Sequence, residues 1–202
     1  MKIQKFDDPK QTPYLYLTEI FSDAQLDLMA KEIQQLVPRM KEPSETGTAG
    51  VVTNPRKKNM GIWLNSAYQY EEQSPALIAL RDVYGHLYSS RAWQNHALDL
   101  IWKGCNQQGI LLSTYGENDE YKTHCDMSIF TGLFWLRNEP HDFDGGDFTF
   151  SDYGITIPCL NNTGVIFIGG EYHEVSPVVP HDESFGGRHV FSVFSTLSPT
   201  PL

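Results

Sequence analysis

The sequence lacks the cysteine pattern and the long apolar runs that mark several large classes of protein. Its three cysteines, Cys105, Cys125 and Cys159, are odd in number and include no CxxC pair. Neither a disulfide framework nor a structural zinc site is therefore indicated. No apolar run approaches the length of a membrane span, and the opening residues MKIQKFDDPK contain no apolar signal segment. We expect a cytoplasmic protein with no membrane partner.

Positive charge is also scarce. The sequence has 15 Lys and Arg residues against 25 Asp and Glu residues, for a formal net charge of -10. Nucleic-acid binding depends on many Lys and Arg contacts to phosphates, so no nucleic-acid partner is expected. The one dense basic run is Arg56-Lys57-Lys58, in a segment rich in Pro, Gly, Ser, Thr and Lys (residues 38–58) that we interpret as a loop.

The remaining composition is that of an ordinary globular protein. Hydrophobic residues make up 40% of the 202 residues and charged residues 20%, which suits one domain spanning residues 1–202. Residues 1–108 are predicted to be mainly helical support, and residues 109–198 to form a strand-rich core. This separation of helices from strands predicts an α+β protein in which helices cover a sheet.

The expected elements follow from hydrophobic spacing and from capping residues. The predicted helices run from a cap at Ser22-Asp23 to Pro38, and over residues 75–103 with a break near Ser89-Ser90. The predicted strands are Met60–Leu64, Ile110–Tyr115, Ile129–Leu136, Asp147–Phe150, Ile155–Ile157, Val165–Ile168, His173–Val175 and Arg188–Thr196. So many short strands in the second half of the chain suggest a barrel or a jelly roll.

A candidate metal site is carried by His124-Cys125-Asp126. Residues two apart on an extended chain point to the same side, so His124 and Asp126 can bind one ion together. His173, on a distant strand, is the best third ligand. Two histidines and one carboxylate form the facial triad of non-haem Fe(II) oxygenases, although Mn, Co, Ni or Zn could bind the same ligands. Taken alone, the H-x-D spacing is equally compatible with a surface turn.

A second polar group is expected on the last strand. Arginine binds a carboxylate through two parallel hydrogen bonds, so Arg188 could anchor a dicarboxylic acid. Strand alternation places Ser192 on the same face as Arg188, where its hydroxyl could add a contact. The alternative is a surface arginine on an edge strand.

Residues Ile110 to Leu197 resemble the catalytic half of the Fe(II)/2-oxoglutarate-dependent dioxygenases, and in particular the prolyl 4-hydroxylase-like branch. The motifs that carry the resemblance occur in the family's order. They are Tyr115-Gly116, His124-x-Asp126, Phe134-Trp135-Leu136, Gly145-Gly146-Asp147-Phe148, His173-Glu174-Val175-x-Pro177 and Arg188.

The resemblance implies a double-stranded β-helix that holds iron through His124, Asp126 and His173, and Arg188 as the 2-oxoglutarate anchor. It implies that 2-oxoglutarate and O2 are consumed, that succinate and CO2 are released, and that ascorbate stimulates turnover. It also implies that Tyr115 and an aromatic residue of Phe134-Trp135 line the cosubstrate pocket. A tyrosine that only packs in the core is the alternative for Tyr115.

The substrate stays open between a residue of a peptide or protein, such as a prolyl residue, a free amino acid and a small metabolite. Substrate contacts in such folds lie on loops, here residues 38–58 and 179–187. The basic run Arg56-Lys57-Lys58 is either a solvated cluster or a lid that suits an anionic substrate. Two other functions remain alternatives: a non-catalytic, cupin-like metal- and ligand-binding protein, and a metal-dependent hydrolase with Glu174 as its base.

Overall fold

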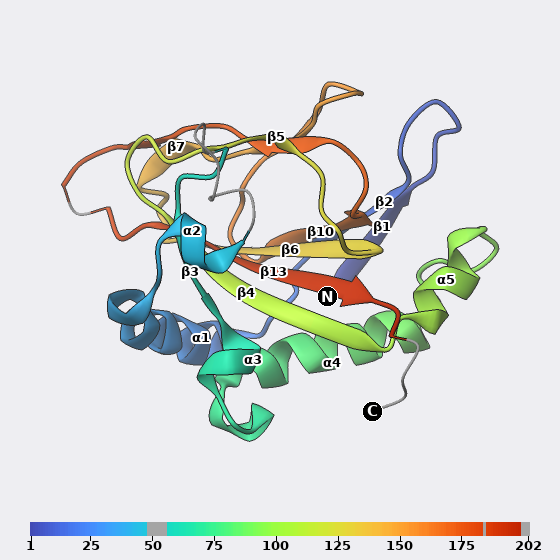
Figure 1. Ribbon diagram of the computed structural model, residues 1–202, viewed down its shortest axis with the longest axis horizontal. Coiled ribbons are helices and arrows are strands. Elements are labelled where there is room, and N and C mark those ends of the chain that lie inside the picture. The colour runs from blue at the N-terminus through green and yellow to red at the C-terminus, as the bar shows by residue number, and fades with distance from the viewer. Residues whose placement is uncertain (48–55, 184, 199–202) are drawn as a thin grey trace.

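The computed structural model describes residues 1–47, 56–183 and 185–198, and its largest element is an antiparallel sheet of seven strands. The strand order is β1-β2-β10-β6-β13-β4-β3 (Figure 1). The bounds are Lys2–Phe6 for β1, Tyr14–Thr18 for β2, Thr163–Ile168 for β10, Phe130–Leu136 for β6, Arg188–Thr196 for β13, Gln107–Tyr115 for β4 and Met60–Trp63 for β3.

A smaller sheet faces the large one. It has the order β5-β11-β8-β9, and a two-stranded pair, β12-β7, lies beside it (Figure 1). The bounds are Tyr121–His124 for β5, His173–Val175 for β11, Phe148–Phe150 for β8, Ile155–Ile157 for β9, Val178–Pro180 for β12 and Phe143–Gly145 for β7. Buried aromatic side chains, among them Trp135, Phe148, Phe150 and Phe167, fill the space between the sheets. The fold is a double-stranded β-helix, or jelly roll.

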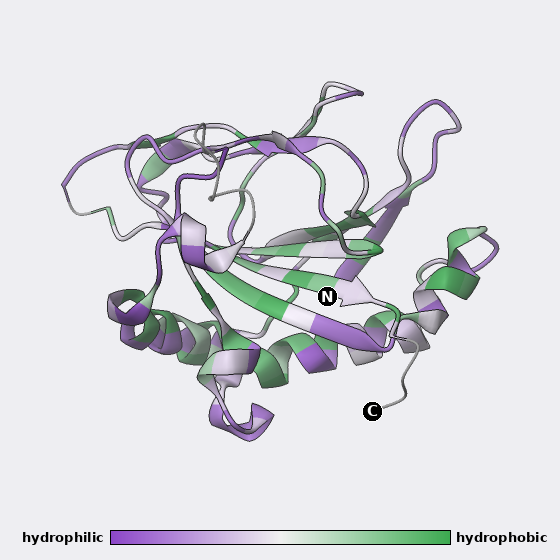
Figure 2. Ribbon diagram, in the orientation of Figure 1, coloured by the Kyte–Doolittle hydropathy of each residue, from purple (hydrophilic) through white to green (hydrophobic). Residues whose placement is uncertain are grey.

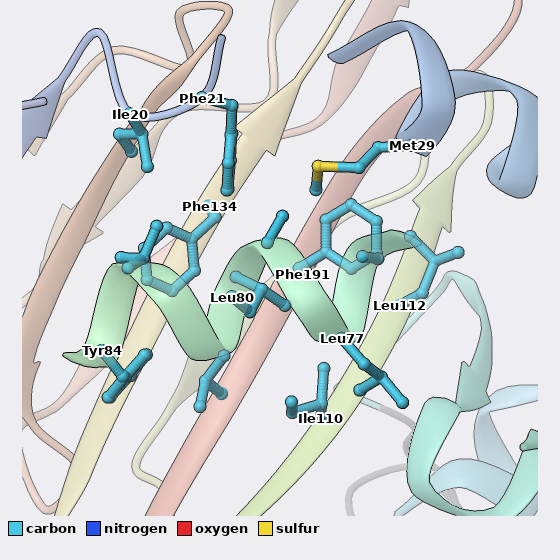
Figure 3. Close-up of a cluster of buried hydrophobic side chains, with 14 of the residues drawn as sticks. Ile20, Phe21, Met29, Leu77, Leu80, Tyr84, Ile110, Leu112, Phe134 and Phe191 are labelled. Atoms are coloured by element: carbon cyan, nitrogen blue, oxygen red, sulfur yellow. The ribbon is translucent and has the colours of Figure 1, made fainter. Parts of the chain in front are cut away.

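The longer helices pack on the opposite face of the large sheet (Figure 1). Those of at least seven residues are α1 (Asp23–Leu36), α4 (Pro75–Ser89) and α5 (Leu98–Gly104). The short helical turns are η1 (Val37–Arg39), α2 (Pro43–Thr46), α3 (Leu64–Ala67) and η3 (Glu71–Gln73). In Figure 3, Leu77, Leu80 and Tyr84 of α4 point at Phe134 and Phe191 of the sheet. Hydrophobic residues accordingly gather on α4 and on the strands above it, whereas many outer loops are hydrophilic (Figure 2).

Helix α1 begins where the sequence predicts. Ser22 and Gln25 form a capping box, which satisfies backbone N–H groups at the open end of the helix. A buried carboxylate then fastens α1 to α4: Glu32 accepts hydrogen bonds from the Ser74 hydroxyl (2.6 Å) and the Ala76 N–H (2.8 Å). Since Ala76 lies in the first turn of α4, the negative charge also meets the positive end of that helix.

Both long predicted helices and all eight predicted strands are present, with ends shifted by three residues or fewer. The predicted break after residue 89 separates α4 from α5. Five strands were not predicted: β1, β2, β5, β7 and β12. The segment 38–58, predicted as a loop, contains most of the helical turn η1 and the whole of the short helix α2. Residues 48–55 of this segment lie outside the described residues. No helix in the described residues combines the length and the apolar character needed to cross a bilayer.

Candidate metal centre and adjoining cavity

Three predicted metal ligands converge at one mouth of the β-helix. His124 ends β5 and His173 begins β11, and the two residues are direct partners across this antiparallel pair. Asp126 follows β5 by two residues. Its carboxylate oxygens lie 3.9 Å from His124 Nε2 and 3.6 Å from His173 Nε2. Ligands at right angles around an ion, with bonds of about 2.1 Å, would be roughly 3 Å apart, so a small closure completes the site.

Backbone carbonyls orient both histidine rings. The Nδ1 atom of His124 lies 2.8 Å from the Lys122 carbonyl oxygen, and that of His173 lies 2.8 Å from the Glu171 carbonyl oxygen. A carbonyl can only accept, so each Nδ1 carries the hydrogen and each Nε2 presents its lone pair to the centre. Burial, reinforced by the nearby His173, lowers the pKa of His124 to about 3, so its ring is neutral at pH 7.

Hydroxyl groups hold the carboxylate ligand. The Thr131 hydroxyl donates to Asp126 Oδ2 at 2.6 Å, and the Ser128 hydroxyl lies 2.7 Å from Thr131 Oγ1. The Asp126 N–H also donates to the Gly169 carbonyl oxygen at 2.7 Å. Burial raises the pKa of Asp126, whereas His173, the Thr131 hydroxyl and Lys57 oppose that shift. These contacts fix the carboxylate orientation, as outer partners of a metal ligand do.

A β-bulge brings an unpredicted residue, Tyr121, to the metal site. The pairs His173 with His124 and Val175 with Tyr121 enclose one residue on β11 and two on β5. The extra residue turns Tyr121 to the same side as His124, and the two rings stack with centroids 3.4 Å apart. Strand alternation alone would put positions 121 and 124 on opposite faces. The contact between Tyr121 and His124 therefore depends on the bulge and could not be predicted from strand alternation.

A cavity of about 820 Å³ adjoins the three ligands. Predicted site residues that line it include Tyr115, Arg188 and Ser192. From the predicted loop 38–58, Arg56 and Lys57 also line it, whereas no described residue of 179–187 does so. Asn59, Trp63 and Tyr121 also line the cavity, although none was selected from the sequence as a site residue.

Arg188 is buried with part of its guanidinium unpaired. The side chain is 1% exposed, and its Nε donates to the Gly146 carbonyl oxygen at 2.7 Å. The remaining nitrogens, Nη1 and Nη2, have no hydrogen-bond partner of normal geometry among the described residues, and the Cys159 thiol, a weak acceptor, interacts with the guanidinium. The guanidinium carbon lies 4.6 Å from the centroid of the Tyr115 ring. A buried cation without an acceptor is costly, so this group indicates a site for an anion.

The Gly-Gly turn is needed to accommodate Arg188. Gly146 has a φ of +66°, and a Cβ atom there would lie 2.6 Å from the Cδ atom of Arg188. Gly145 has a φ of +72°, and its Cβ would lie 2.1 Å from the Pro177 carbonyl oxygen. Both the conformation and the close approach therefore exclude a side chain.

The aromatic residues expected near the cosubstrate are placed differently from one another. Tyr115 lines the cavity and also belongs to the buried cluster between the sheets. It is therefore both a cavity residue and a core-packing residue. Burial raises its pKa to about 12, which keeps the phenol protonated. The expectation for Phe134-Trp135 needs correction, because neither residue lines the cavity. Phe134 faces the helices (Figure 3), and Trp135 is fully buried between the sheets.

Two further groups were weighed in the sequence or stand out in the structure. Glu174 accepts a hydrogen bond from the Thr123 hydroxyl at 2.5 Å and does not line the cavity, so it is poorly placed to act as a hydrolytic base. His141, Asp144 and His181 form a second cluster of possible metal ligands, but all three are solvent-exposed.

Comparisons with known proteins establish the fold. No family model and no curated protein sequence matches the chain. Among solved structures, a prolyl-4-hydroxylase from Pseudomonas putida matches with a TM-score of 0.63 at 14% identity, covering 94% of this chain and 95% of that one. A Trichoplax adhaerens prolyl hydroxylase, solved with a hypoxia inducible factor peptide fragment, matches with a TM-score of 0.65 at 13% identity, covering 91% and 83%.

A viral collagen prolyl hydroxylase from Paramecium Bursaria Chlorella virus-1, solved as its 2OG complex, matches with a TM-score of 0.58 at 14% identity, covering 92% and 96%. The chain therefore shares the fold of these prolyl hydroxylases, as the resemblance in the sequence motifs implied. At these identities the likeness establishes the fold, and the site has to be argued from its own geometry.

Proposed function

We propose that the protein is an Fe(II)- and 2-oxoglutarate-dependent dioxygenase that hydroxylates an organic substrate. The observation that carries the proposal is one cavity that holds both a His-Asp-His metal site and the unpaired guanidinium of Arg188. A metal site alone would suit many functions. The added buried cation calls for an anionic ligand next to the metal, which is the arrangement a chelating dicarboxylate needs.

Each residue has a distinct task in this proposal. The Nε2 atoms of His124 and His173 and the carboxylate of Asp126 would hold Fe(II), which with 2-oxoglutarate would supply the oxygen chemistry that yields succinate and CO2. Arg188 would bind the distal carboxylate of 2-oxoglutarate through Nη1 and Nη2. The Tyr115 phenol, kept protonated by burial, can donate a hydrogen bond to the cosubstrate.

The size of the cavity supports a second bound molecule. Its volume of about 820 Å³ lies in the upper part of the roughly 300–1,000 Å³ range of small-molecule sites. We infer that the organic substrate occupies the part of the cavity lined by Arg56, Asn59 and Trp63. A peptide or protein residue, such as a prolyl residue, is the first substrate class to test, because one structural neighbour was solved with a peptide fragment.

The decisive experiment measures succinate. The protein is loaded with Fe(II) and 2-oxoglutarate without oxygen and then exposed to O2, with Asp126→Ala and His173→Ala as site variants. We expect succinate from the wild type, at least at the slow rate seen without substrate, and none from either variant. His86→Ala, at an exposed position on α4, is the matched control and should retain wild-type activity. Equal succinate from Asp126→Ala would refute the assignment of the metal ligands.

A binding measurement separates the enzyme from a non-catalytic protein. With Mn(II) in place of Fe(II), 2-oxoglutarate should bind the wild type, and Arg188→Met should weaken that binding by about tenfold or more. Binding of 2-oxoglutarate without succinate, even with candidate substrates, would favour the cupin-like alternative. Absence of Mn(II)-dependent binding would overturn the proposed function.

A further inference from the structure

We propose that Lys57 is an anion-binding residue for the organic substrate, so that the enzyme acts on a substrate bearing a carboxylate close to the carbon that reacts. The inference rests on the proposed function and extends it to the substrate class. Its starting point is the position of Lys57, which lines the same cavity as the three metal ligands and is only 4% exposed.

The backbone holds Lys57 firmly beside β5. Lys57 forms a β-bridge with Tyr121. On either side of it, the Lys122 N–H donates to the Arg56 carbonyl oxygen (2.8 Å), and the Lys58 N–H donates to the Glu120 carbonyl oxygen (3.0 Å). The segment is thus an added edge strand. The inward direction of the Lys57 side chain follows from pairing and is not a chance surface conformation.

The ammonium group lies close to the metal site. Lys57 Nζ is 6.0 Å from the centroid of the Tyr121 ring, and this ring stacks directly on His124. Asp126 and Lys57 also influence each other electrostatically. A group bound to Lys57 would therefore lie next to the Tyr121 ring, on the side of the cavity where His124 enters.

The charge of Lys57 has no carboxylate partner in the described residues. Among the described residues, Lys57 Nζ donates one hydrogen bond, to the Thr46 hydroxyl at 3.1 Å. No carboxylate oxygen of these residues lies within 4 Å of Nζ. The eight residues that precede Arg56 in the sequence, TAGVVTNP, include no acidic side chain. An ammonium carries three N–H donors, so at least one remains for a ligand. Burial lowers the pKa of Lys57 to about 8, which leaves the group mainly charged at pH 7.

Two buried cations in one cavity require two anions. Arg188 lies beside Tyr115 and Lys57 beside Tyr121, so they mark different parts of the wall. In the proposed function, Arg188 takes the distal carboxylate of 2-oxoglutarate and the metal takes its other end. Asp126 influences Lys57 electrostatically, but its carboxylate is held by Thr131 and directed at the metal site, so the substrate is the remaining source of an anion that can contact Lys57. Asn59 also lines the cavity, and its buried Oδ1, which has no partner among the described residues, can accept a hydrogen bond from an N–H or O–H group of the same substrate.

The charge around the cavity mouth favours the same substrate class. Arg56 also lines the cavity, and its guanidinium donates to the Thr123 carbonyl oxygen at 3.3 Å. The protein as a whole has a net charge of -10, so anions are repelled elsewhere and attracted here. A local positive potential at a cleft raises the encounter rate of an oppositely charged ligand.

The test uses trifluoroacetate as a carboxylate probe. Mn(II) and saturating 2-oxoglutarate are bound to the protein, and the paramagnetic broadening of the ¹⁹F signal reports probe bound near the metal. We expect saturable broadening in the wild type and a loss of about tenfold in probe affinity in Lys57→Met, since a charged hydrogen bond is removed. Lys58→Met is the matched control, because Lys58 is half-exposed and pairs with Glu120, and it should behave as the wild type.

The possible results separate this inference from the proposed function. Unchanged broadening in Lys57→Met, or no broadening in the wild type while 2-oxoglutarate binds, would overturn the role of Lys57 alone. If Lys57→Met lowered the affinity for 2-oxoglutarate as much as the affinity for the probe, Lys57 would be assigned to the cosubstrate. That result would also overturn the role of Lys57 in binding the substrate. Failure of the wild type to bind 2-oxoglutarate would remove the proposed function itself.

A second arm identifies the source of the carboxylate. Succinate formation is measured with free amino acids and their amides, and with capped peptides that carry Asp or Glu beside proline and their Asn or Gln counterparts. Stimulation by free amino acids alone would indicate a small organic acid, and stimulation by acidic peptides alone would indicate a protein substrate. In both cases the neutral counterpart should be weaker, and equal stimulation by the neutral counterpart would refute the inference.

Discussion

At the residue scale, the site depends on partners that orient its charged groups. The candidate metal ligands and Arg188 were all selected from the sequence, yet each is held by a residue to which the sequence analysis gave no role at the site. Carbonyls set the histidine tautomers, Thr131 holds Asp126, and Gly146 gives Arg188 the space it occupies. These partners decide whether the chemical groups point into one cavity.

Thr131 is the most direct test of such positioning. Thr131→Val keeps the shape of this fully buried side chain but removes the hydroxyl that donates to Asp126. Loss of an outer partner of this kind weakens metal binding by about 10–100-fold. Titration calorimetry with Mn(II) would measure the change. Thr149→Val, which removes a hydroxyl on β8 paired only with Thr156, should leave the affinity unchanged. Equal Mn(II) affinities in all three proteins would show that Thr131 has no positioning role.

At the element scale, the helical layer holds the large sheet from behind. Glu32 joins α1 to the first turn of α4, and α4 packs on the sheet that carries Arg188 (Figures 1 and 3). Because Glu32 is buried, its carboxylate depends on these hydrogen bonds for the solvation it has lost.

Glu32→Ala should therefore lower the stability of the fold. It leaves the Ser74 hydroxyl and the Ala76 N–H without their acceptor, which costs about 2–4 kcal/mol in the free energy of unfolding. Urea unfolding followed by circular dichroism would measure this loss. Asp27→Ala is the control, since Asp27 is exposed on the same helix and its ion pair with Lys31 contributes little. A change below about 0.5 kcal/mol in Glu32→Ala would mean that the link is unimportant.

The element scale also shows where prediction from the sequence stopped. Long segments such as α1 and α4 were predicted because capping residues and helical spacing are local signals. Strands β7 (FDG) and β12 (VVP) each include a turn-forming residue, and β5 (YKTH) is largely polar, so none of them shows the apolar alternation that marks equally short strands such as β8 (FTF) and β9 (ITI). Strands β1 and β2 belong to the sheet only through pairing with β10, a partner about 150 residues away along the chain. Such pairing leaves no mark on the local sequence.

At the scale of the whole molecule, buried histidines make stability depend on pH. Burial lowers the pKa of His124 to about 3 and that of His189 to about 4, against about 6.5 for an unfolded chain. Between these values the unfolded state binds more protons than the folded state, so stability rises with pH. The contribution of these two histidines to the stability of the folded state is complete above about pH 6.5. It is lost progressively as the pH falls toward about 4.

We therefore expect the Tm of the metal-free protein to fall steadily from pH 7 to pH 4.5. His189→Gln should reduce the slope, because Gln keeps a polar partner for Thr114 but does not titrate. His86→Ala, at an exposed position, should leave the slope unchanged. Differential scanning calorimetry at a series of pH values would measure both effects. A slope for His189→Gln equal to that of the wild type would show that His189 does not contribute.

By itself, the sequence determined the fold class, the separation of helices from strands and the candidate ligands His124, Asp126 and His173 with Arg188 as the candidate anion-binding residue. Those features rest on residue type, order and spacing along the chain, which can be read without coordinates. The tertiary structure decided the rest. The bulge in β5 stacked Tyr121 on His124, and the register of β6 turned Phe134 toward the helices. The bridge from Lys57 to Tyr121 brought a buried ammonium into the cavity, because contacts between distant segments depend on register and packing that no local pattern encodes.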